Sequence, residues 1–224
     1  MRVRGDVAPL KDLEVLMKER GLIFVVSAPS GAGKTSLCRK ITEVVPNLQH
    51  SVSYTTRPPR EGEVDGKSYF FVDNAKFQQM VERKEFIEWA EVHGNLYGTS
   101  REVLMDLIDR GIDVILDVDS QGALQFKKRH KEGVFIYVLP PSFEDLKNRL
   151  KERQTESHEE IVRRLKKAKE EIWNYREYYY LIINDDLKKA FRELEAIIVS
   201  ERIRMKRMNL GWIEENFIKC KEAF

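Results

Sequence analysis

The stretch Leu22–Ser36, LIFVVSAPSGAGKTS, decides how the rest of the chain is interpreted. Its first six residues, Leu22–Ser27, are almost all apolar, which is typical of a strand that is buried on both faces of a sheet. The next nine, Ala28–Ser36, are similar to the phosphate-binding pattern of a glycine, four residues and Gly-Lys-Ser/Thr at the start of a helix. We therefore expect a strand, a phosphate-binding loop and a helix in succession.

The residues of this phosphate loop (residues 28–36) have predicted roles in holding a nucleoside triphosphate. Gly31 and Gly33 let the backbone turn so that N–H groups point at a phosphate, and the following helix adds the positive end of its dipole. We expect Lys34 to bridge the β- and γ-phosphates, and the hydroxyl of Thr35 to bind Mg²⁺. Ala28 replaces the first glycine of the general pattern. The predicted ATP-binding residues of the loop are Ala28, Pro29, Ser30, Gly31, Ala32, Gly33, Lys34, Thr35 and Ser36.

Three more apolar runs extend the predicted sheet, namely Ile112–Val118, Val134–Leu139 and Leu181–Asn184. Helical patterns lie between them, so the chain is expected to be an α/β protein with a parallel central sheet. Capping residues mark where helices are expected to begin. These residues are Ser100, Ser142 and Ser157, and a further helical pattern follows Asp185.

Residues 51–92 interrupt this alternation of apolar strands and helices. The stretches at residues 51–55 (SVSYT), 67–72 (KSYFFV) and 86–92 (FIEWAEV) are polar and alternating, which is typical of strands with one solvated face. We expect a small, mostly antiparallel insertion here, with a helix over Asp73–Glu85. A second interruption is the highly charged segment Lys147–Lys169, which favours a solvated, mobile cover.

Two arginines, Arg57 and Arg60, lie three residues apart in a loop with two prolines between them. Arginine pairs with phosphate through two parallel hydrogen bonds, and proline lowers the entropy lost in holding the pair in place. Two arginines on a loop are otherwise typical of a solvated surface. Beside a triphosphate site, we interpret them as ligands of a second, acceptor phosphate. Tyr69 and Tyr97 are candidates for further donors, with aromatic packing as the alternative.

Glu88 is a carboxylate among apolar neighbours in the predicted strand at residues 86–92. A buried carboxylate needs paired donors, and guanine offers two adjacent ones, N1–H and the N2 amino group, whereas adenine presents an acceptor at N1. A solvent-facing position on an alternating strand explains the pattern equally well. Both interpretations stand at this point.

Asp117 and Asp119 come at the end of the apolar run Ile112–Val118. In open α/β sheets, ligands bind outside the carboxyl ends of the parallel strands. The two carboxylates are therefore candidates to hold Mg²⁺ through water or to accept hydrogen bonds from the acceptor base. An ordinary acidic loop residue is the alternative for each.

Composition excludes several other classes of protein. The 224 residues carry a net charge of +2, which is too balanced for a protein that mainly coats nucleic acid. The longest strongly apolar run is far short of the ~20 residues that span a bilayer. The cysteines, Cys38 and Cys220, form no metal or redox motif. We expect a cytoplasmic protein that binds neither nucleic acid nor membrane.

Several separate segments of the chain resemble the guanylate kinase family, from about Leu22 to Arg202. They include APSGAGKTS, SVSYTTRPPREGEVDGKSYFFV, FIEWAEVHGNLYGTS, ILDVDSQGA, VLPPSFEDLKNRLKER and LIINDDL, in this order. The resemblance implies an enzyme that transfers the γ-phosphoryl group of ATP to GMP or dGMP, with Mg²⁺ as cofactor. It also implies a P-loop three-layer fold with a nucleotide-binding insertion and a helical lid.

The resemblance implies roles for residues across the chain. The implied GMP-binding residues are Ser53, Arg57, Arg60, Tyr69, Glu88, Tyr97, Gly98, Thr99 and Asp119. Lid arginines Arg153 and Arg164 are similar to those that fold over the transferring phosphoryl group, and with Lys34 and Arg57 they form the implied catalytic set. Asn184 resembles a residue near the adenine of ATP. Thr35 and, through water, Asp117 are the implied metal ligands.

The chain is expected to be a single domain over residues 1–224. The predicted core covers about 22–50, 100–146 and 167–205, with the GMP-binding insertion at about 51–99, the lid at about 147–166 and extensions at 1–21 and 203–224. Residues 9–20 are predicted to form a short helix. The apolar stripe Ile213, Phe217, Cys220 and Phe224 is expected to dock on the chain's own core, with a dimer contact as the alternative.

Two other functions compete with this interpretation. One is a kinase on the same scaffold with a different phosphorylated acceptor. The other is a catalytically silent binding module that resembles the guanylate-kinase-like domains of scaffold proteins. The intact Lys34 and Thr35 favour an enzyme over a silent module. Whether the chain is a monomer or a homodimer is left open.

Overall fold

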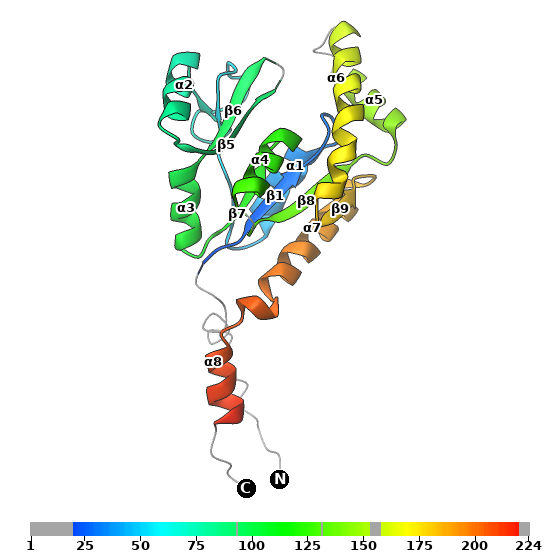
Figure 1. Ribbon diagram of the computed structural model, residues 1–224. Helices are drawn as coiled ribbons and strands as arrows, with labels where there is room; N and C mark the ends of the chain where they lie inside the picture. Colours follow the sequence, from blue (N-terminus) through cyan, green and yellow to red (C-terminus); the bar gives the residue numbers. More distant parts are fainter. Residues whose placement is uncertain (1–19, 93, 131, 153–157, 220–224) are drawn as a thin grey trace.

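The computed structural model describes residues 20–92, 94–130, 132–152 and 158–219, and its central layer is a five-stranded sheet (Figure 1). All neighbouring strands are parallel, in the order β2-β7-β1-β8-β9. The strands are β1 (Ile23–Ser27), β2 (Leu48–His50), β7 (Asp113–Asp117), β8 (Val134–Leu139) and β9 (Tyr180–Ile183). The prediction of an α/β fold with a parallel sheet is confirmed. The edge strand β2 was not predicted, because only one of its three residues is buried.

Helices cover both faces of this sheet. On one face, α1 (Lys34–Val44) and α7 (Leu187–Arg202) contribute to a core cluster with β1 and β8. On the other face, α3 (Arg101–Asp109) and α4 (Ser120–Arg129) contribute to a second cluster. The predicted cap Ser100 accepts the N–H of Val103, and Asp186 caps α7.

The predicted insertion is a second, smaller sheet in the order β4-β3-β6-β5. Its strands are β3 (Tyr54–Thr55), β4 (Phe70–Phe71), β5 (Phe86–Val92) and β6 (Asn95–Ser100), and the helix α2 (Asn74–Glu82) packs on it through Phe77 and Met80. The β5–β6 and β3–β6 pairs are antiparallel, but β3 and β4 are parallel. The mostly antiparallel insertion predicted from the sequence is confirmed, and the one parallel pair arises because a long loop, and not a tight hairpin turn, joins β3 to β4.

The charged segment forms two helices, α5 (Phe143–Lys151) and α6 (His158–Glu171), followed by the 3-10 helix η2 (Ile172–Glu177). The predicted cap Ser142 accepts the N–H of Asp145, and the predicted cap Ser157 lies outside the described residues. The two helices share a small apolar cluster of their own, centred on Leu146, Leu150 and Ala168. Figure 1 shows α5 and α6 together on the opposite side of the molecule from the second sheet.

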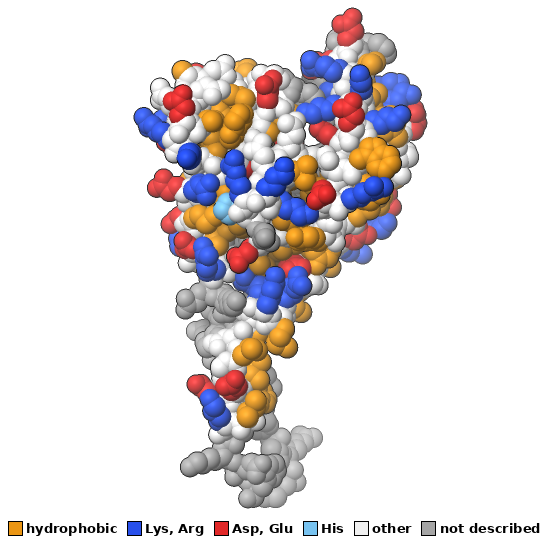
Figure 2. Space-filling view, in the orientation of Figure 1, with side chains coloured by type: hydrophobic (Ala, Val, Ile, Leu, Met, Phe, Trp, Pro, Cys, Tyr) orange, Lys and Arg blue, Asp and Glu red, His pale blue; other side chains and the backbone are white. Residues whose placement is uncertain are grey.

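The described part of the chain ends in η3 (Met205–Arg207), α8 (Leu210–Ile213) and the π-helix η4 (Glu214–Ile218). Figure 1 shows α8 extending away from the body of the molecule, and Figure 2 shows hydrophobic side chains on the surface of this extension. The predicted docking of the apolar stripe on the core is wrong for Phe217, which is 67% exposed. Its ring contacts that of Trp212 instead, with 5.5 Å between centroids. Cys220, Phe224 and the predicted helix at 9–20, apart from Arg20, lie outside the described residues. No helix in the described part of the chain is long and apolar enough to cross a bilayer.

Candidate active site

The phosphate loop joins β1 to α1 and depends on its two glycines. Gly31 and Gly33 have φ angles of 97° and 88°, which L side chains rarely adopt. A Cβ atom at Gly33 would lie 2.5 Å from Nδ2 of Asn184, and one at Gly31 would lie 2.9 Å from a methyl group of Leu150. Ala28 is buried with an ordinary negative φ. The departure from the general pattern therefore causes no backbone strain.

The loop is held from the outside by Asn184 and Arg149. The buried side-chain amide of Asn184 donates to the carbonyl of Ala32 at 2.8 Å, so it braces the middle of the loop. Arg149, on α5, donates to the carbonyl of Asn184 at 2.8 Å and to that of Ala32 at 3.5 Å. The sequence analysis missed Arg149, because one more cation in a highly charged helix gives no distinguishing signal.

Lys34 and Asp117 form a buried ion pair at the edge of this loop. The Lys34 ammonium lies 2.5 Å from Oδ1 of Asp117 and also donates to the carbonyl of Val118. Burial alone would raise the pKa of Asp117, but the Lys34 charge and its hydrogen bond hold that pKa below its ordinary value. The hydroxyl of Thr35 also donates to this carboxylate. Asp117 is therefore ionised at neutral pH.

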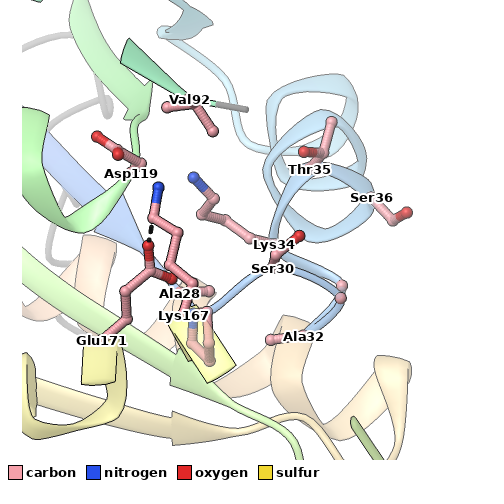
Figure 3. Close-up of a pocket in the computed structure, with 13 residues that line it drawn as sticks. Ala28, Ser30, Ala32, Lys34, Thr35, Ser36, Val92, Asp119, Lys167 and Glu171 are labelled. Carbon is pink, nitrogen blue, oxygen red and sulfur yellow. Dashed lines mark ion pairs between the residues drawn. The ribbon is translucent and has the colours of Figure 1, made fainter. Parts of the chain in front are cut away.

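A pocket opens between the phosphate loop and the start of α4 (Figure 3). Besides the nine residues of the loop, its lining consists of Val92, Asp119, Lys167 and Glu171. Lys167 and Glu171 form an ion pair at 3.5 Å on α6, and Figure 3 shows this pair facing the side of the pocket that holds Asp119. Sequence reasoning missed both residues, because a Lys and a Glu four positions apart are equally typical of a solvated helix face.

Glu88 lies in the interior, with only 3% of its surface exposed. The solvent-facing interpretation is therefore wrong. One carboxylate oxygen accepts the hydroxyl proton of Thr99 at 2.5 Å, and the other lies against the backbone of Gly122. Burial, and then the nearby Asp119 charge, raise the pKa of Glu88 to about 7, although the Thr99 hydrogen bond opposes the shift.

Asp119 is the N-cap of α4, and its Oδ1 accepts the N–H of Gly122 at 2.8 Å. Its other oxygen, Oδ2, is buried and has no hydrogen-bond partner among the described residues. A buried acceptor without a partner is costly in a folded protein and indicates a ligand or water contact. The prediction that this carboxylate serves a ligand is consistent with its position in the pocket lining.

The residues predicted to hold the acceptor phosphate gather beside β3 and β4. The Arg57 guanidinium lies over the ring of Tyr69 at 5.5 Å, and the rings of Tyr69 and Tyr97 pack edge to face at 5.9 Å. The Arg60 side chain is exposed. Glu63, which the sequence analysis did not single out, accepts two hydrogen bonds from Arg57.

Three further predicted site residues are Ser53, Gly98 and Arg164. Ser53 is half-buried, and its carbonyl accepts the N–H of Phe70. Gly98 lies against the ring of Phe86, where a Cβ atom would come within 2.9 Å. Arg164 reaches from α6 to donate to the hydroxyl of Ser30 in the phosphate loop. The prediction for Arg153 concerns a residue outside those that the structure describes.

A protein-family model described as guanylate kinase matches residues 20–201, which include the phosphate loop, the second sheet and the helices α5 and α6. The chain belongs to the guanylate kinase family. This match covers most of the chain, so the family predicted from the sequence is confirmed.

Curated guanylate kinases are similar over nearly their full lengths. That of Geobacter metallireducens is 50% identical over 201 residues, covering 90% of this chain and 98% of the relative. That of Geobacter sulfurreducens is 51% identical over 192 residues, covering 86% and 95%. The crystal structure of guanylate kinase from Anaplasma phagocytophilum is 34% identical, with a TM-score of 0.77 over 92% of this chain and all of that one.

These matches confirm three predictions made from the sequence. They are the family, the fold class and the activity of a nucleotide kinase that uses ATP and GMP. They do not assign roles to individual residues. The predicted site residues and domain boundaries therefore stay predictions.

Proposed function

We propose that this chain transfers the γ-phosphoryl group of ATP to GMP or dGMP and that guanine is read by Glu88, Thr99 and Asp119. The observation that carries this assignment is the buried carboxylate of Glu88 beside the half-buried Asp119, whose Oδ2 has no hydrogen-bond partner among the described residues. Guanine presents adjacent donors at N1 and N2, which match such acceptors. Adenine presents an acceptor at N1, which a carboxylate repels. Ser53 and Gly98 are predicted to complete the base site.

On the donor side, the phosphate loop holds the triphosphate through its N–H groups, with Lys34 as the neighbouring cation. The positive φ angles of Gly31 and Gly33 support this role. Asn184 supports the loop from behind through its hydrogen bond to Ala32. In this proposal, Asn184, which lies directly after β9, also takes the place near the adenine of ATP that the family resemblance implies.

The residues present fit the predicted Mg²⁺. Mg²⁺ is usually bound by one or two protein oxygens together with phosphates and water, and Thr35 and Asp117 offer a hydroxyl and an ionised carboxylate that contact each other. These two residues would hold the ion, Asp117 through water. When bound, Mg²⁺ neutralises the negative charge that builds up on the β- and γ-phosphate oxygens.

At the acceptor phosphate, Arg57, Tyr69 and Tyr97 supply an already assembled set of donors. Arg60 is exposed, so in this proposal its side chain turns inward when GMP binds. Two polyanions have to approach each other during the reaction, and fixed cations lower the Coulomb repulsion between them.

The chemistry then needs no general base, because an oxygen of the GMP phosphate is already a nucleophile. That oxygen forms a bond to the γ-phosphorus while the bond from the γ-phosphorus to the β–γ bridging oxygen breaks, and ADP leaves. Arg164, which already contacts Ser30, and Arg153 are placed by the proposal on the transferring group. Closure of α5 and α6 excludes water, which would otherwise hydrolyse ATP.

A coupled assay of ADP formation tests the proposal. The purified full chain is supplied with ATP and Mg²⁺ and with GMP, dGMP, AMP, CMP or a sugar phosphate. We expect rapid ADP formation with GMP and dGMP and little with the others. Preference for another acceptor would contradict the base assignment, and binding of GMP without turnover would make the chain a silent binding module.

A further inference from the structure

The loop between β3 and β4 contains a carboxylate that connects the two predicted phosphate-binding arginines. Oε1 and Oε2 of Glu63 accept hydrogen bonds from Nη2 of Arg57 at 2.8 and 2.9 Å. Oε2 also accepts the backbone N–H of Arg60 at 2.8 Å. One carboxylate therefore fixes the side chain of one arginine and the backbone of the other.

This contact is shielded from water, unlike most ion pairs on the surface. The side chains of Arg57 and Glu63 are only 11% and 16% exposed. Burial by itself would raise the pKa of Glu63, but the Arg60 N–H and the Arg57 guanidinium hold that pKa below its ordinary value. Glu63 is therefore charged at neutral pH. A shielded pair between a carboxylate and a guanidinium holds a more defined geometry than an exposed one.

Glu63 also determines which part of the guanidinium is left to face a ligand. Both Nη2 contacts go to Glu63, and Nη1 donates to the carbonyl of Pro58 at 2.7 Å. The two N–H groups of Nη2 point away from each other, so only one of them faces the Glu63 carboxylate, in a bifurcated hydrogen bond, and two of the five N–H donors of arginine are used within the loop. The other three are left for a ligand or for Tyr97, whose side chain also interacts with the guanidinium. The free donors are therefore held in one orientation.

We infer that Glu63 is a positioning residue of the acceptor-phosphate site: it holds Arg57 and the turn at Arg60 in the orientation that binds the phosphate of GMP. This inference rests on the proposed role of Arg57 as a ligand of that phosphate. Glu63 contributes no contact of its own to GMP. Its effect is to remove, before GMP arrives, the rotational freedom that Arg57 would otherwise lose on binding.

The test compares E63Q with the unchanged chain in GMP titrations and steady-state kinetics. Glutamine keeps the size of the side chain but replaces one acceptor oxygen by an amino group, which cannot accept from Arg57. We expect the Kd and KM for GMP to rise by about 10- to 100-fold, because a small misplacement of a binding group has effects of this size. The KM for ATP should stay within twofold. E63D, which restores the charge, should recover part of the GMP affinity.

E61Q is the matched control, because Glu61 lies in the same loop and is exposed, and we expect no change in its GMP affinity. R57A and the double variant R57A/E63Q complete a cycle of mutants. If Glu63 acts through Arg57, the double variant should bind GMP as weakly as R57A alone, so the two losses should not add.

Contrary results would overturn either the inference about Glu63 or the proposed role of Arg57. Tighter GMP binding by E63Q would show that the carboxylate competes with phosphate for Arg57 and would overturn the inference. Additive losses, unchanged GMP binding by E63Q, or an equal loss of ATP and GMP affinity would overturn it as well. If R57A itself bound GMP normally, the acceptor-phosphate assignment in the proposed function would be wrong, which distinguishes the two failures. Thermal unfolding of every variant identifies any that fail to fold.

Discussion

The backbone of Gly122 lies so close to the carboxylate of Glu88 that a Cβ atom at position 122 would overlap Oε2 of Glu88. The same atom would approach Oδ1 of Asp119 to 3.3 Å. The first turn of α4 thus contacts both acids, and only glycine leaves room for them.

Gly122→Ala is therefore predicted to disturb guanine recognition. Alanine is favoured over glycine inside a helix, so a loss here would come from the displaced Glu88 carboxylate and not from the helix. We expect the KM for GMP to rise by about tenfold or more, with an overpacking cost to stability of about 1–3 kcal/mol and an unchanged KM for ATP. Steady-state kinetics and denaturant unfolding measure these quantities. Gln121→Ala, at an exposed position next to it, is the control and should show neither effect.

Glu88→Gln is predicted to weaken GMP binding far more than ATP binding. The amide keeps one acceptor oxygen but turns a donor toward the donors of guanine, which leaves a buried group unmatched. We expect kcat/KM for GMP to fall by about 100-fold or more, while the Kd for ATP changes little. Equilibrium titration of each nucleotide checks this result. Equal weakening of both nucleotides would mean that Glu88 has only a structural role.

The raised pKa of Glu88 also predicts how stability depends on pH. The unfolded carboxyl titrates near 4.5 and the folded one at about 7, so the folded protein binds the proton more tightly. The resulting stability is fully present below pH 4.5 and is lost as the pH rises to 7 and above. This shift corresponds to about 3 kcal/mol.

Denaturant unfolding of the unchanged chain and of E88Q between pH 4.5 and 8 measures this contribution. We expect the free energy of unfolding of the unchanged chain to decrease with pH relative to that of E88Q, which lacks the titrating group. Parallel pH profiles for the two proteins would show that Glu88 titrates at its ordinary pKa.

Lys34→Ala is predicted to abolish turnover and to reduce stability. We expect kcat to fall by about 10³-fold or more, because a cation that faces the transferring phosphoryl group contributes on this scale. Asp117 would also lose its partner, which costs about 3–5 kcal/mol for a buried pair. The double variant K34A/D117N should regain part of the stability but none of the activity. Lys40→Ala, exposed on the same helix, is the control, and near-normal activity of K34A would refute the site.

Much of the fold could be predicted from patterns of neighbouring residues in the sequence. The four apolar runs became the four longest strands of the parallel sheet, because a continuous apolar run has no solvated face and can only be buried on both sides. The phosphate loop is equally local, since its shape depends on Gly31 and Gly33 within nine consecutive residues. The strands of the insertion were harder to predict. The strand β6 was not predicted, because most of its residues are polar or glycine. The parallel pairing of β3 with β4 was not predicted either, because it depends on the long loop between them.

The sequence by itself determined the family, the sheet and the position of the predicted phosphate loop, because each of these depends on neighbouring residues whose spacing is fixed by the chain. Tertiary structure alone decided that Glu88 is buried against Gly122, that Asn184 and Arg149 brace the loop, and that Lys167 and Glu171 line its pocket. These contacts join residues dozens of positions apart. The burial and the pKa of a site residue depend on its neighbours in space, and the spacing of residues along the chain does not show which neighbours these are.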